Sequence, residues 1–261
     1  ITDGNGCTAT YVGVVSQPSA AISLNFTTTP SLCFGGTSGG VNLTVNGGVP
    51  GYTYSWSNGS TTEDLTNVGA GSYTVTVQDQ NGCLMSGSIV VGQPASALTL
   101  SQTTTHVSCY GGTNGYINLS ATGGTPGYAY VWSNTATTQD LSNISSGGYS
   151  VVVTDANGCT SNLSVLVNQP SSLVSVSGTV SNVLCFGGTT GSITSTGQGG
   201  TSPYSYAWSN GETTSQVNGL SAGLYTVTVS DANGCTATQT WGITQPSALS
   251  LQSTNTNILC Y

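Results

Sequence analysis

Alternating apolar and polar residues predict a β-strand that ends in a tight turn between Gly71 and Cys83. An apolar residue occupies every second position, at Tyr73, Val75 and Val77. This alternation gives a strand one apolar and one polar face. The Asp-Gln-Asn-Gly run that follows favours a turn, because an Asp side chain can bond its own backbone and Asn-Gly tolerates positive φ.

The same segment recurs along the chain with a fixed step. A period of about 76 residues, which indicates a tandem array, separates the turn cysteines Cys7, Cys83, Cys159 and Cys235. A second set of cysteines keeps the step except for its last member, which comes one residue early: Cys33, Cys109, Cys185 and Cys260. We expect the end of a preceding repeat at 1–20, repeats at 21–94, 95–170 and 171–246, and the start of a following repeat at 247–261, as in a segment cut from a longer protein.

Each repeat is expected to fold as an antiparallel Ig-like β-sandwich. In the middle repeat, about seven short strands separated by turn residues are predicted, and no segment shows helical periodicity. The first strand is expected to be broken by a polar Thr run, with its two parts near 98–100 and 106–109. The remaining strands are predicted at 116–121, 128–132, 139–144, 147–154 and 160–167. Separate cores are expected rather than one continuous β-solenoid.

Two aromatic positions per repeat are predicted to be structural. A Trp on the third strand matches the buried Trp of such sandwiches, and a Tyr after a Gly-containing turn matches a tyrosine corner. The predicted core residues are Trp56, Trp132, Trp208, Tyr73, Tyr149 and Tyr225.

The charge of the chain limits its partners. Its 261 residues include no Lys or Arg and eight acidic residues, which gives a formal charge of −8. Nucleic acid is therefore excluded as a partner, because phosphate neutralisation needs cations. Membrane insertion is not expected, since no apolar run approaches the ~20 residues of a span. Weak charge repulsion between copies favours contacts with copies of itself or with neighbouring repeats, as in a polymeric assembly.

The cysteines predict disulfides. Eight cysteines stand in register with a single His in the chain, so zinc sites are disfavoured. Disulfides place the protein outside the cell or at the cell surface. All eight are expected to be bonded.

Two pairing patterns remain open. One joins the two cysteines within each repeat, such as Cys33 with Cys83. The other joins cysteines on either side of a Gln-Pro segment, such as Cys83 with Cys109. The first meets a geometric objection, because a strand of ~8 residues spans ~26 Å and a disulfide needs Cα atoms within ~7 Å. That objection favours the second pattern, with a hairpin at the Gln-Pro turn.

Long motifs resemble a known family. The runs CFGGTTGSI at 185–193, GGTSPYSYAWSNGETT at 199–214 and GLSAGLYTVTVSDANGC at 219–235 resemble the SprB repeat, and the resemblance extends over every repeat. It implies a secreted, multi-repeat cell-surface protein of the kind found in giant adhesins of gliding Bacteroidetes, exported by the type IX route. It implies no catalytic residues.

Catalytic chemistry and cofactors are not expected. His106 is the single His and has no repeated partner. The neighbours Glu63 and Asp64 would face opposite sides of a strand, unlike paired catalytic carboxylates. Weak calcium candidates are the turn acids Asp79, Asp155 and Asp231, for which a simple Asx-type turn is the alternative.

The sequence therefore favours a non-catalytic structural or adhesive repeat region of a surface protein or extracellular filament. Two alternatives are an array that binds surface glycans through aromatic residues such as Tyr110 or Phe186, and the spacer region of a larger secreted enzyme.

Overall fold

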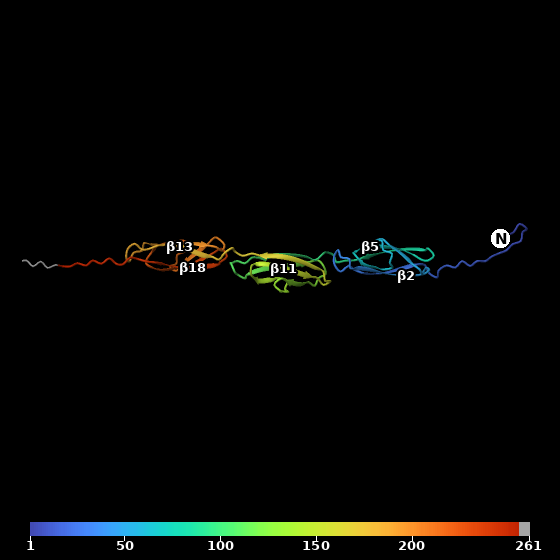
Figure 1. Ribbon diagram of the computed structural model, residues 1–261, viewed down its shortest axis with the longest axis horizontal. Helices are drawn as coiled ribbons and strands as arrows, with labels where there is room; N and C mark the ends of the chain where they lie inside the picture. The colour runs from blue at the N-terminus through green and yellow to red at the C-terminus, as the bar shows by residue number, and fades with distance from the viewer. Residues whose placement is uncertain (256–261) are drawn as a thin grey trace, which may run out of the picture. The chain divides into compact units, whose positions relative to one another are not determined.

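The computed structural model describes residues 1–255, and all of its regular structure is β-strand. Each repeat contributes six strands (Figure 1). The first has β1 (Ser23–Thr29), β2 (Gly39–Asn46), β3 (Thr53–Trp56), β4 (Leu65–Val68), β5 (Gly71–Gln78) and β6 (Leu84–Val91). The second has β7 (Thr99–Thr105), β8 (Gly115–Thr122), β9 (Ala129–Trp132), β10 (Leu141–Ile144), β11 (Gly147–Thr154) and β12 (Thr160–Val167). The third has β13 (Ser175–Ser181), β14 (Gly191–Gln198), β15 (Ser205–Trp208), β16 (Gln216–Leu220), β17 (Gly223–Ser230) and β18 (Thr236–Ile243).

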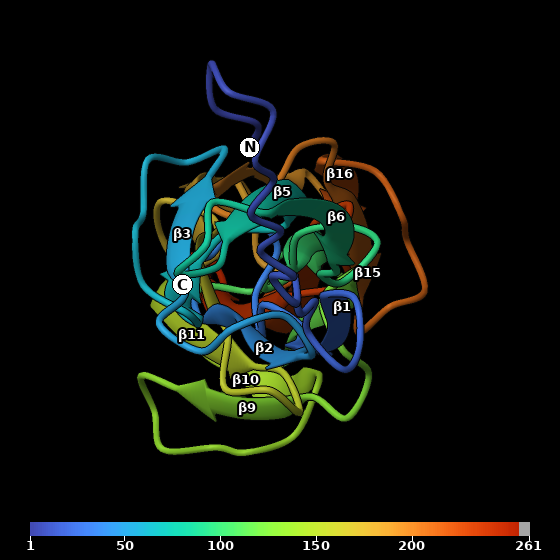
Figure 2. The ribbon, with the colours of Figure 1, turned by 90° about the vertical axis from the view of Figure 1, so that its right-hand side faces the viewer.

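The strands of each repeat form two three-stranded sheets. In the first repeat the orders are β1-β2-β4 and β3-β5-β6, and the pairs within them are antiparallel. Figure 2 shows β1 and β2 in one layer and β5 and β6 in another. The other repeats keep this topology, with sheets β10-β8-β7, β12-β11-β9, β13-β14-β16 and β15-β17-β18. The chain is thus a tandem set of Ig-like β-sandwiches, as the alternation predicts.

The first strand of each repeat differs from the prediction. The Thr run of the middle repeat lies inside β7, and residues 106–109 form no strand, so six strands are present instead of seven. β7 lies at the edge of its sheet. The β-branched Thr side chains suit the exposed face of such a strand.

Each repeat buries its own apolar residues. The first core contains Val41, Leu43, Trp56, Leu65, Val75, Val77 and Val91. The third contains Val183, Ile193, Trp208, Val217, Leu220, Val227, Val229 and Ile243. Among the buried residues of the middle repeat are Ile117, Leu119, Trp132, Val151, Val153 and Val167. These separate sheets and cores differ from a continuous solenoid.

The Trp of each repeat is buried and hydrogen-bonded. Trp132 is only 2% exposed, and its indole N–H donates to the carbonyl of Thr138 at 2.9 Å. This bond satisfies the one polar atom of the side chain. Trp56 and Trp208 donate in the same way, to Thr62 and Thr214.

The Tyr of each repeat forms a tyrosine corner. The Tyr149 hydroxyl donates to the carbonyl of Ser145, four residues earlier, at 3.0 Å. Tyr73 and Tyr225 make the equivalent bonds. These side chains are partly exposed, so their contribution to the fold is local, at the entry to β5, β11 and β17.

The first and third cores are filled from different strands. In the first repeat, Phe26 of β1 packs over Gly87 of β6, where an added Cβ would lie 2.9 Å from the ring. In the third repeat the ring comes from the last strand and the glycine from the first. Trp241 of β18 packs over Gly178 of β13, and an added Cβ there would again lie 2.9 Å from the ring. Each large ring thus requires a glycine opposite it. The two repeats therefore differ in both the ring and the glycine position, and the sandwich is the same.

The described chain divides into two compact units. One contains 1–101, 121–130 and 152–162, and the other contains 102–120, 131–151 and 163–261, of which the last six residues are outside the described part. Each unit contains one disulfide.

A hydroxyl inserted into the first core should destabilise it without changing its shape. Val77 is fully buried in β5, so Val77→Thr should lower the free energy of unfolding by about 1–3 kcal/mol, because the new hydroxyl has to be buried. The measurement is urea unfolding of the purified chain.

The matched control is Val90→Thr in β6, where the side chain is 65% exposed. This variant should change the free energy by less than about 0.5 kcal/mol. Equal effects at the two positions would contradict the assignment of Val77 to the core.

Candidate functional site: the cystine junctions

A buried Asp organises the turn that precedes the last strand of each repeat. We name residues 79–83, 155–159 and 231–235 the aspartate turns. In the middle one, Asp155 Oδ1 accepts the backbone N–H groups of Asn157 and Cys159, both at 2.9 Å. Oδ2 accepts the N–H of Thr125 at 2.8 Å, which fixes the turn to the loop before β9. The other two turns have the same bonds.

These hydrogen bonds stabilise the ionised carboxylates. The backbone N–H groups of Val49 and Thr125 are the largest causes that lower the pKa of Asp79 and Asp155, respectively. Burial raises the pKa of Asp231, but the amides around it outweigh this effect and lower it overall.

The same geometry bears on the calcium candidates. In each aspartate turn, both carboxylate oxygens face N–H donors, whose hydrogens carry positive partial charge, whereas Ca²⁺ needs surrounding oxygen atoms. The described residues also contain no group of three or more His, Cys, Asp or Glu side chains placed to hold a metal. The arrangement therefore fits an Asx-type turn.

The cysteines of the second set, Cys33, Cys109 and Cys185, lie on another preorganised segment. We name residues 31–38, 107–114 and 183–190 the cysteine loops. In the middle loop the N–H of Gly111 donates to the side-chain oxygen of Gln169 at 2.8 Å, and the N–H of Gly112 donates to the carbonyl of Cys109 at 2.9 Å. Gly111 has a φ of 75°, which an L side chain rarely adopts. Gln169 belongs to the Gln-Pro segment after β12, so that segment fixes the loop.

A cysteine loop and an aspartate turn are joined by a disulfide in both described pairs. Cys33 is bonded to Cys159, and Cys109 is bonded to Cys235, with Cα–Cα distances of 5.7 and 5.8 Å. Both pairs are 126 residues apart in sequence. Each bond therefore joins the loop of one repeat to the turn of the next. The Cα distances lie in the usual range for disulfides.

A side-chain hydrogen bond accompanies each disulfide. The Asn157 amide nitrogen donates to the carbonyl of Leu32 at 3.0 Å, and Asn233 donates to the carbonyl of Ser108 at 2.9 Å. The same Asn side chains are oriented by the hydroxyls of Thr125 and Thr201. We call the disulfide and its Asn contact together a cystine junction.

Both predicted pairing patterns are wrong. The two cysteines of one repeat do not pair, because they lie at opposite ends of one sandwich. At the start of the Cys33 loop, the backbone N–H of Ser31 donates to the carbonyl of Gly92, which lies just after the end of β6. Cys83 lies just before the start of β6. β6 has eight residues, and a strand of that length spans roughly 26 Å.

The hairpin pattern fails for a topological reason. β6 pairs with β5 and β7 belongs to the sheet with β8, so the Gln-Pro segment between β6 and β7 connects two sandwiches and folds no hairpin. Cys7, Cys83 and Cys185 are exposed and form no disulfide within residues 1–255, so the expectation that all eight cysteines are bonded is not met there. Cys260 lies outside the described residues.

The other candidate residues have structural partners. His106 Nδ1 accepts the backbone N–H of Asn168 at 3.1 Å. Asp64 accepts the N–H of Leu43, so its carboxylate connects the β3–β4 loop to β2. Burial, followed by the nearby carboxylate of Glu63, raises the pKa of Tyr54 to about 12. The hydrogen bonds of His106 and Asp64 thus connect neighbouring segments of their own sandwiches.

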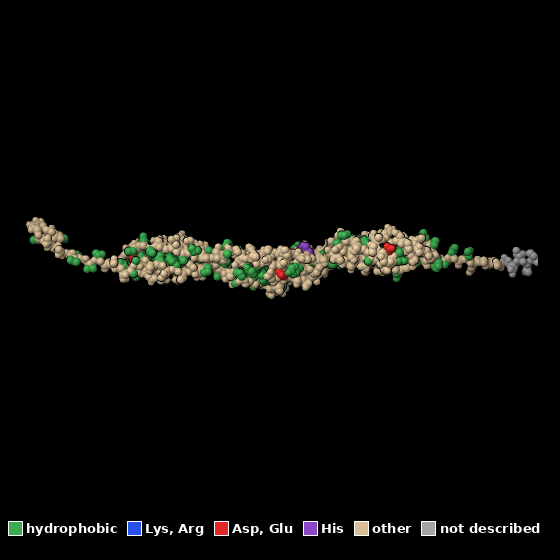
Figure 3. Space-filling view, turned by 180° about the vertical axis from the view of Figure 1, so that it is seen from behind, with side chains coloured by type: hydrophobic (Ala, Val, Ile, Leu, Met, Phe, Trp, Pro, Cys, Tyr) green, Lys and Arg blue, Asp and Glu red, His purple; other side chains and the backbone are tan. Residues whose placement is uncertain are grey.

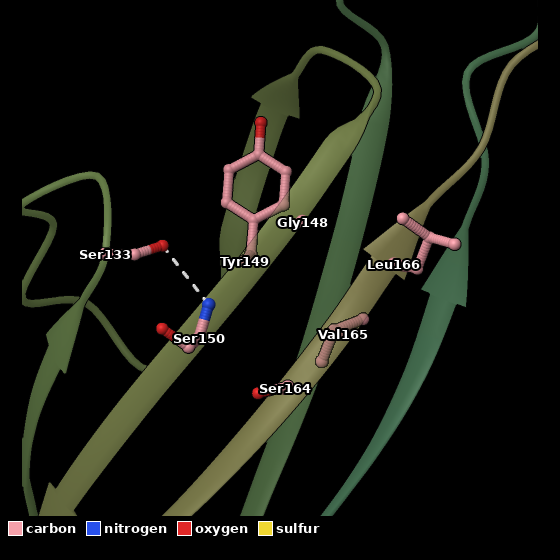
Figure 4. Close-up of a pocket in the computed structure, with 7 residues that line it drawn as sticks. All are labelled: Ser133, Gly148, Tyr149, Ser150, Ser164, Val165 and Leu166. Atoms are coloured by element: carbon pink, nitrogen blue, oxygen red, sulfur yellow. Dashed lines mark hydrogen bonds between the residues drawn. The ribbon is translucent and has the colours of Figure 1, made fainter.

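A shallow hollow lies outside the junctions, on the surface of the middle repeat. It measures about 380 Å³ and lies on β11 and β12, where the Ser150 N–H donates to Ser133 Oγ (Figure 4). Its other lining residues are Gly148, Tyr149, Ser164, Val165 and Leu166. The view in Figure 3 shows few acidic side chains and one His on a mostly uncharged face. No charged group lines the hollow.

The sequence did not reveal the Gln and Asn residues of the junctions. Gln93, Gln169 and Gln245 each accept the N–H of a loop glycine 58 residues earlier. They recur with the same repeat step as the cysteines. Their recurrence at the repeat step was the signal that the sequence offered. The hydrogen bond between each Gln and its loop glycine depends on the fold.

Comparison with known proteins gives one family. The model described as "SprB repeat" matches residues 25–61, 101–137 and 177–213. No curated protein matches the chain in sequence. Among the described residues, no helix has the length and apolar character needed to cross a membrane.

Solved structures of tandem domains are similar at low identity. Drosophila OTK extracellular domains 3–5 match at 15% identity over 89% of this chain and 100% of theirs, with a TM-score of 0.29. The eight N-terminal Ig domains of DSCAM match at 13% over 85% and 34%, with a TM-score of 0.32. The Ca²⁺-stabilised adhesin with which an Antarctic bacterium binds ice matches at 19% over 88% and 74%, with a TM-score of 0.33. At these scores the likeness gives no information on ligand or activity.

Acid should weaken the aspartate turns. Since the folded pKa of each turn Asp is below its unfolded value near 3.9, its stabilisation is complete above that value and is lost as the pH falls through the folded pKa. The melting temperature should be constant from pH 7 to about 5 and fall below about 4. Calorimetry across this range measures it.

Variants distinguish the effect of the turn aspartates on the pH profile from the effect of the other carboxylates. Replacing Asp79, Asp155 and Asp231 together by Asn should lower the melting temperature at pH 7 and flatten the decline in acid. The control is Glu212→Gln at an exposed position, which should retain the parental pH profile. An unchanged profile in the triple variant would refute the assigned role.

The observed pairing makes a second prediction. In the chain-entropy model, a disulfide closing a loop of 126 residues contributes about 5 kcal/mol. Replacing Cys33 and Cys159 by Ser should therefore lower the melting temperature by on the order of 10 °C. Replacing Cys83 and Cys185, which form no disulfide within the described residues, is the matched control and should have little effect.

Peptide mapping without reduction identifies the bonds directly. Because the chain has no Lys or Arg and no aromatic residue between Cys83 and Cys109 or between Cys159 and Cys185, the digestion uses a protease that cuts after Leu as well as after aromatic residues. The linked peptides should contain Cys33 with Cys159 and Cys109 with Cys235. A Cys33–Cys83 or Cys83–Cys109 peptide would contradict the structure.

Proposed function

Because the chain carries three SprB repeats, we propose that it is a spacer that transmits mechanical force in the repeat region of a long, secreted cell-surface adhesin. The observation that carries this proposal is the pair of disulfides that join the first and second cysteine loops to the aspartate turn of the next repeat. Disulfides fit an oxidising, extracellular location. On this proposal, the units are residues 21–94, 95–170 and 171–246, and the chain performs no catalysis.

The disulfides support a mechanical role because they bypass much of the backbone. A force applied to the two ends passes from Cys33 to Cys159 and from Cys109 to Cys235. The shortest covalent path from one end of the chain to the other runs through both disulfides and contains about 110 of the 261 residues. If the sandwiches unfold under load, most of the chain therefore adds no length.

The polar surface fits the same role. The chain lacks Lys and Arg, and the carboxylates of Asp79, Asp155 and Asp231 accept backbone N–H groups. Salt screens ion pairs between exposed charges. A spacer stabilised by amide–carboxylate bonds and disulfides is therefore less sensitive to the salt concentration outside the cell.

The structure gives less support to an array of sugar-binding domains. Tyr110, one of the aromatic candidates, lines the cystine junction together with Cys109 and Cys235. Its position is explained by the junction. The hollow of Figure 4 has hydroxyl groups but is open and shallow.

Pulling on single molecules tests the spacer role. With 3.3–3.6 Å per extended residue, the reduced chain should reach about 900 Å and the oxidised chain about 380 Å before rupture. Force spectroscopy measures both lengths on the same molecule, before and after addition of a reductant.

The C33S/C159S variant is the control for this experiment. It should extend further than the parent under oxidising conditions, because one bypass is lost. Equal lengths with and without reductant would refute the proposal. Strong binding on a glycan array by the folded chain would instead favour the sugar-binding alternative.

A further inference from the structure

Each cystine junction contains an Asn-Gly pair, a dipeptide that is prone to deamidation. The backbone nitrogen that follows an Asn can attack the side-chain amide carbon, and a Gly has no Cβ to hinder this approach. The pairs are Asn157-Gly158 in the first junction and Asn233-Gly234 in the second. Both Asn residues are exposed, so water has access to them. A chemically labile residue thus lies at each junction.

The turn and the junction together require this pair. Gly158 has a φ of 84° and Gly234 a φ of 80°, a conformation that L side chains rarely adopt. The amide of the preceding Asn supplies the donor that bonds the opposite cysteine loop. Replacing the Gly would strain the turn, and replacing the Asn would remove a junction contact.

The closed junction restrains the amide of Asn157. The amide nitrogen donates to the carbonyl of Leu32 at 3.0 Å and to Thr125 Oγ1 at 2.8 Å. This nitrogen is the group that has to leave during deamidation. Since both bonds fix the orientation of the amide, a rotation of its carbon toward the backbone nitrogen of Gly158 has to break them.

The attacking nitrogen is also engaged. The N–H of Gly158 donates to the carbonyl of Asp155 at 3.0 Å, and Gly234 makes the equivalent bond to Asp231. The nitrogen has to lose this proton before it can attack a carbonyl carbon. The turn therefore opposes the reaction at its second partner as well.

The second junction repeats the side-chain contacts. The Asn233 amide donates to the carbonyl of Ser108 at 2.9 Å and to Thr201 Oγ1 at 3.1 Å. In both junctions the hydroxyl belongs to the same repeat as the Asn, whereas the carbonyl belongs to the cysteine loop of the preceding repeat. The contact to the loop is the one that depends on a closed junction.

We propose that Asn157 and Asn233 are deamidation sites that the closed cystine junction protects, and that opening of a junction by an external thiol releases them to react. The inference rests on the contacts of the junction. It goes beyond the spacer role, which does not involve the Asn amides.

Deamidation replaces the amide by a carboxylate. The Gly158 nitrogen gives up its proton and bonds to the side-chain carbonyl carbon of Asn157. The bond from this carbon to Nδ2 breaks, and Nδ2 leaves as ammonia with that proton. One water molecule then opens the five-membered succinimide, at the side-chain carbonyl to give aspartate or at the backbone carbonyl to give isoaspartate. The net reaction consumes one water and releases one ammonia.

Either product weakens a later closure of the junction. A carboxylate has no N–H, so the donor to the Leu32 carbonyl is lost and two acceptor oxygens face each other. The new charge also lies two residues from the Asp155 carboxylate, which adds like-charge repulsion. Isoaspartate lengthens the backbone before Cys159 by one carbon and so displaces its sulfur. A junction that has been open is thereby marked covalently.

Site-resolved deamidation rates test the protection. The parent, C33S/C159S and C109S/C235S chains are incubated at mildly alkaline pH in water enriched in heavy oxygen, which labels each new carboxylate for mass spectrometry. In C33S/C159S, Asn157 should deamidate about tenfold faster than in the parent, because its amide loses the contact to the loop. Asn233 should keep the parental rate in this variant, and C109S/C235S should show the reverse.

Asn210 is the reference in every chain. It is an exposed Asn before a Gly in the turn after β15, where its side-chain oxygen accepts the N–H of Glu212 at 3.3 Å. Its rate should be the same in all variants. Equal acceleration at Asn157, Asn233 and Asn210 would refute the proposal, since a loosened fold would give that result.

Thr125→Val tests the amide contact while the disulfide is intact. Val49 occupies the equivalent position in the first repeat, where its N–H still donates to the turn Asp, so the fold accepts this residue. The variant should deamidate at Asn157 about threefold faster than the parent. Parental rates at Asn157 in both this variant and C33S/C159S would overturn the protection.

The effect on closure is measured with Asn157→Asp. The reduced chains are reoxidised in a glutathione redox buffer, and the Cys33–Cys159 peptide is quantified. The equilibrium constant for closure should be about tenfold lower than in the parent. Asn210→Asp adds the same charge in the turn after β15 and should close like the parent. Equal closure in the two variants would refute the weakening. The force experiment measures chain length, so its outcome is independent of these rates.

Discussion

The separation between the two cysteines of one repeat determines the disulfide pattern of this protein. Cys33 follows β1 and Cys83 precedes β6, at opposite ends of the sandwich. An eight-residue strand of roughly 26 Å lies between those ends, and a disulfide cannot span it. Each cysteine is therefore available to another repeat, and the observed separation of 126 residues is one repeat step more than the separation within a repeat.

The junction depends on polar groups whose hydrogen bonds are also present in the Cys83 turn and the Cys185 loop, where no disulfide is described. A chain without Lys or Arg has no side-chain cations to pair with its carboxylates except its single His. Asp155 instead binds three backbone N–H groups, which are fixed by the turn and cannot reorient toward solvent. Gln169 holds the opposite segment through Gly111. These bonds place the two sulfurs within reach of each other, so the disulfide closes a geometry that already exists.

The cores and the junctions differ in how they tolerate sequence change. Phe26 opposite Gly87 and Trp241 opposite Gly178 fill equivalent space from different strands, because a core requires volume and apolar character rather than particular residues. The junction residues, by contrast, recur at each step as Asp, Asn, Gly and Cys, since each supplies a specific donor, acceptor or φ. The repeats thus differ at positions where only packing matters and agree at positions where hydrogen-bond geometry matters.

The sequence by itself determined the number of repeats, the strands around Val75 and Val77, and the buried Trp of each sandwich, because alternation and period are local properties of the chain. The length expected for a strand also disfavoured, from the sequence alone, a disulfide between the two cysteines of one repeat. The sequence could not show that Cys33 bonds Cys159 or that Gln93 accepts the N–H of Gly35. Those contacts depend on how the Gln-Pro segment after β6 orients the next sandwich in the same compact unit. That orientation follows from the packing of whole sandwiches, so only the tertiary structure decided it.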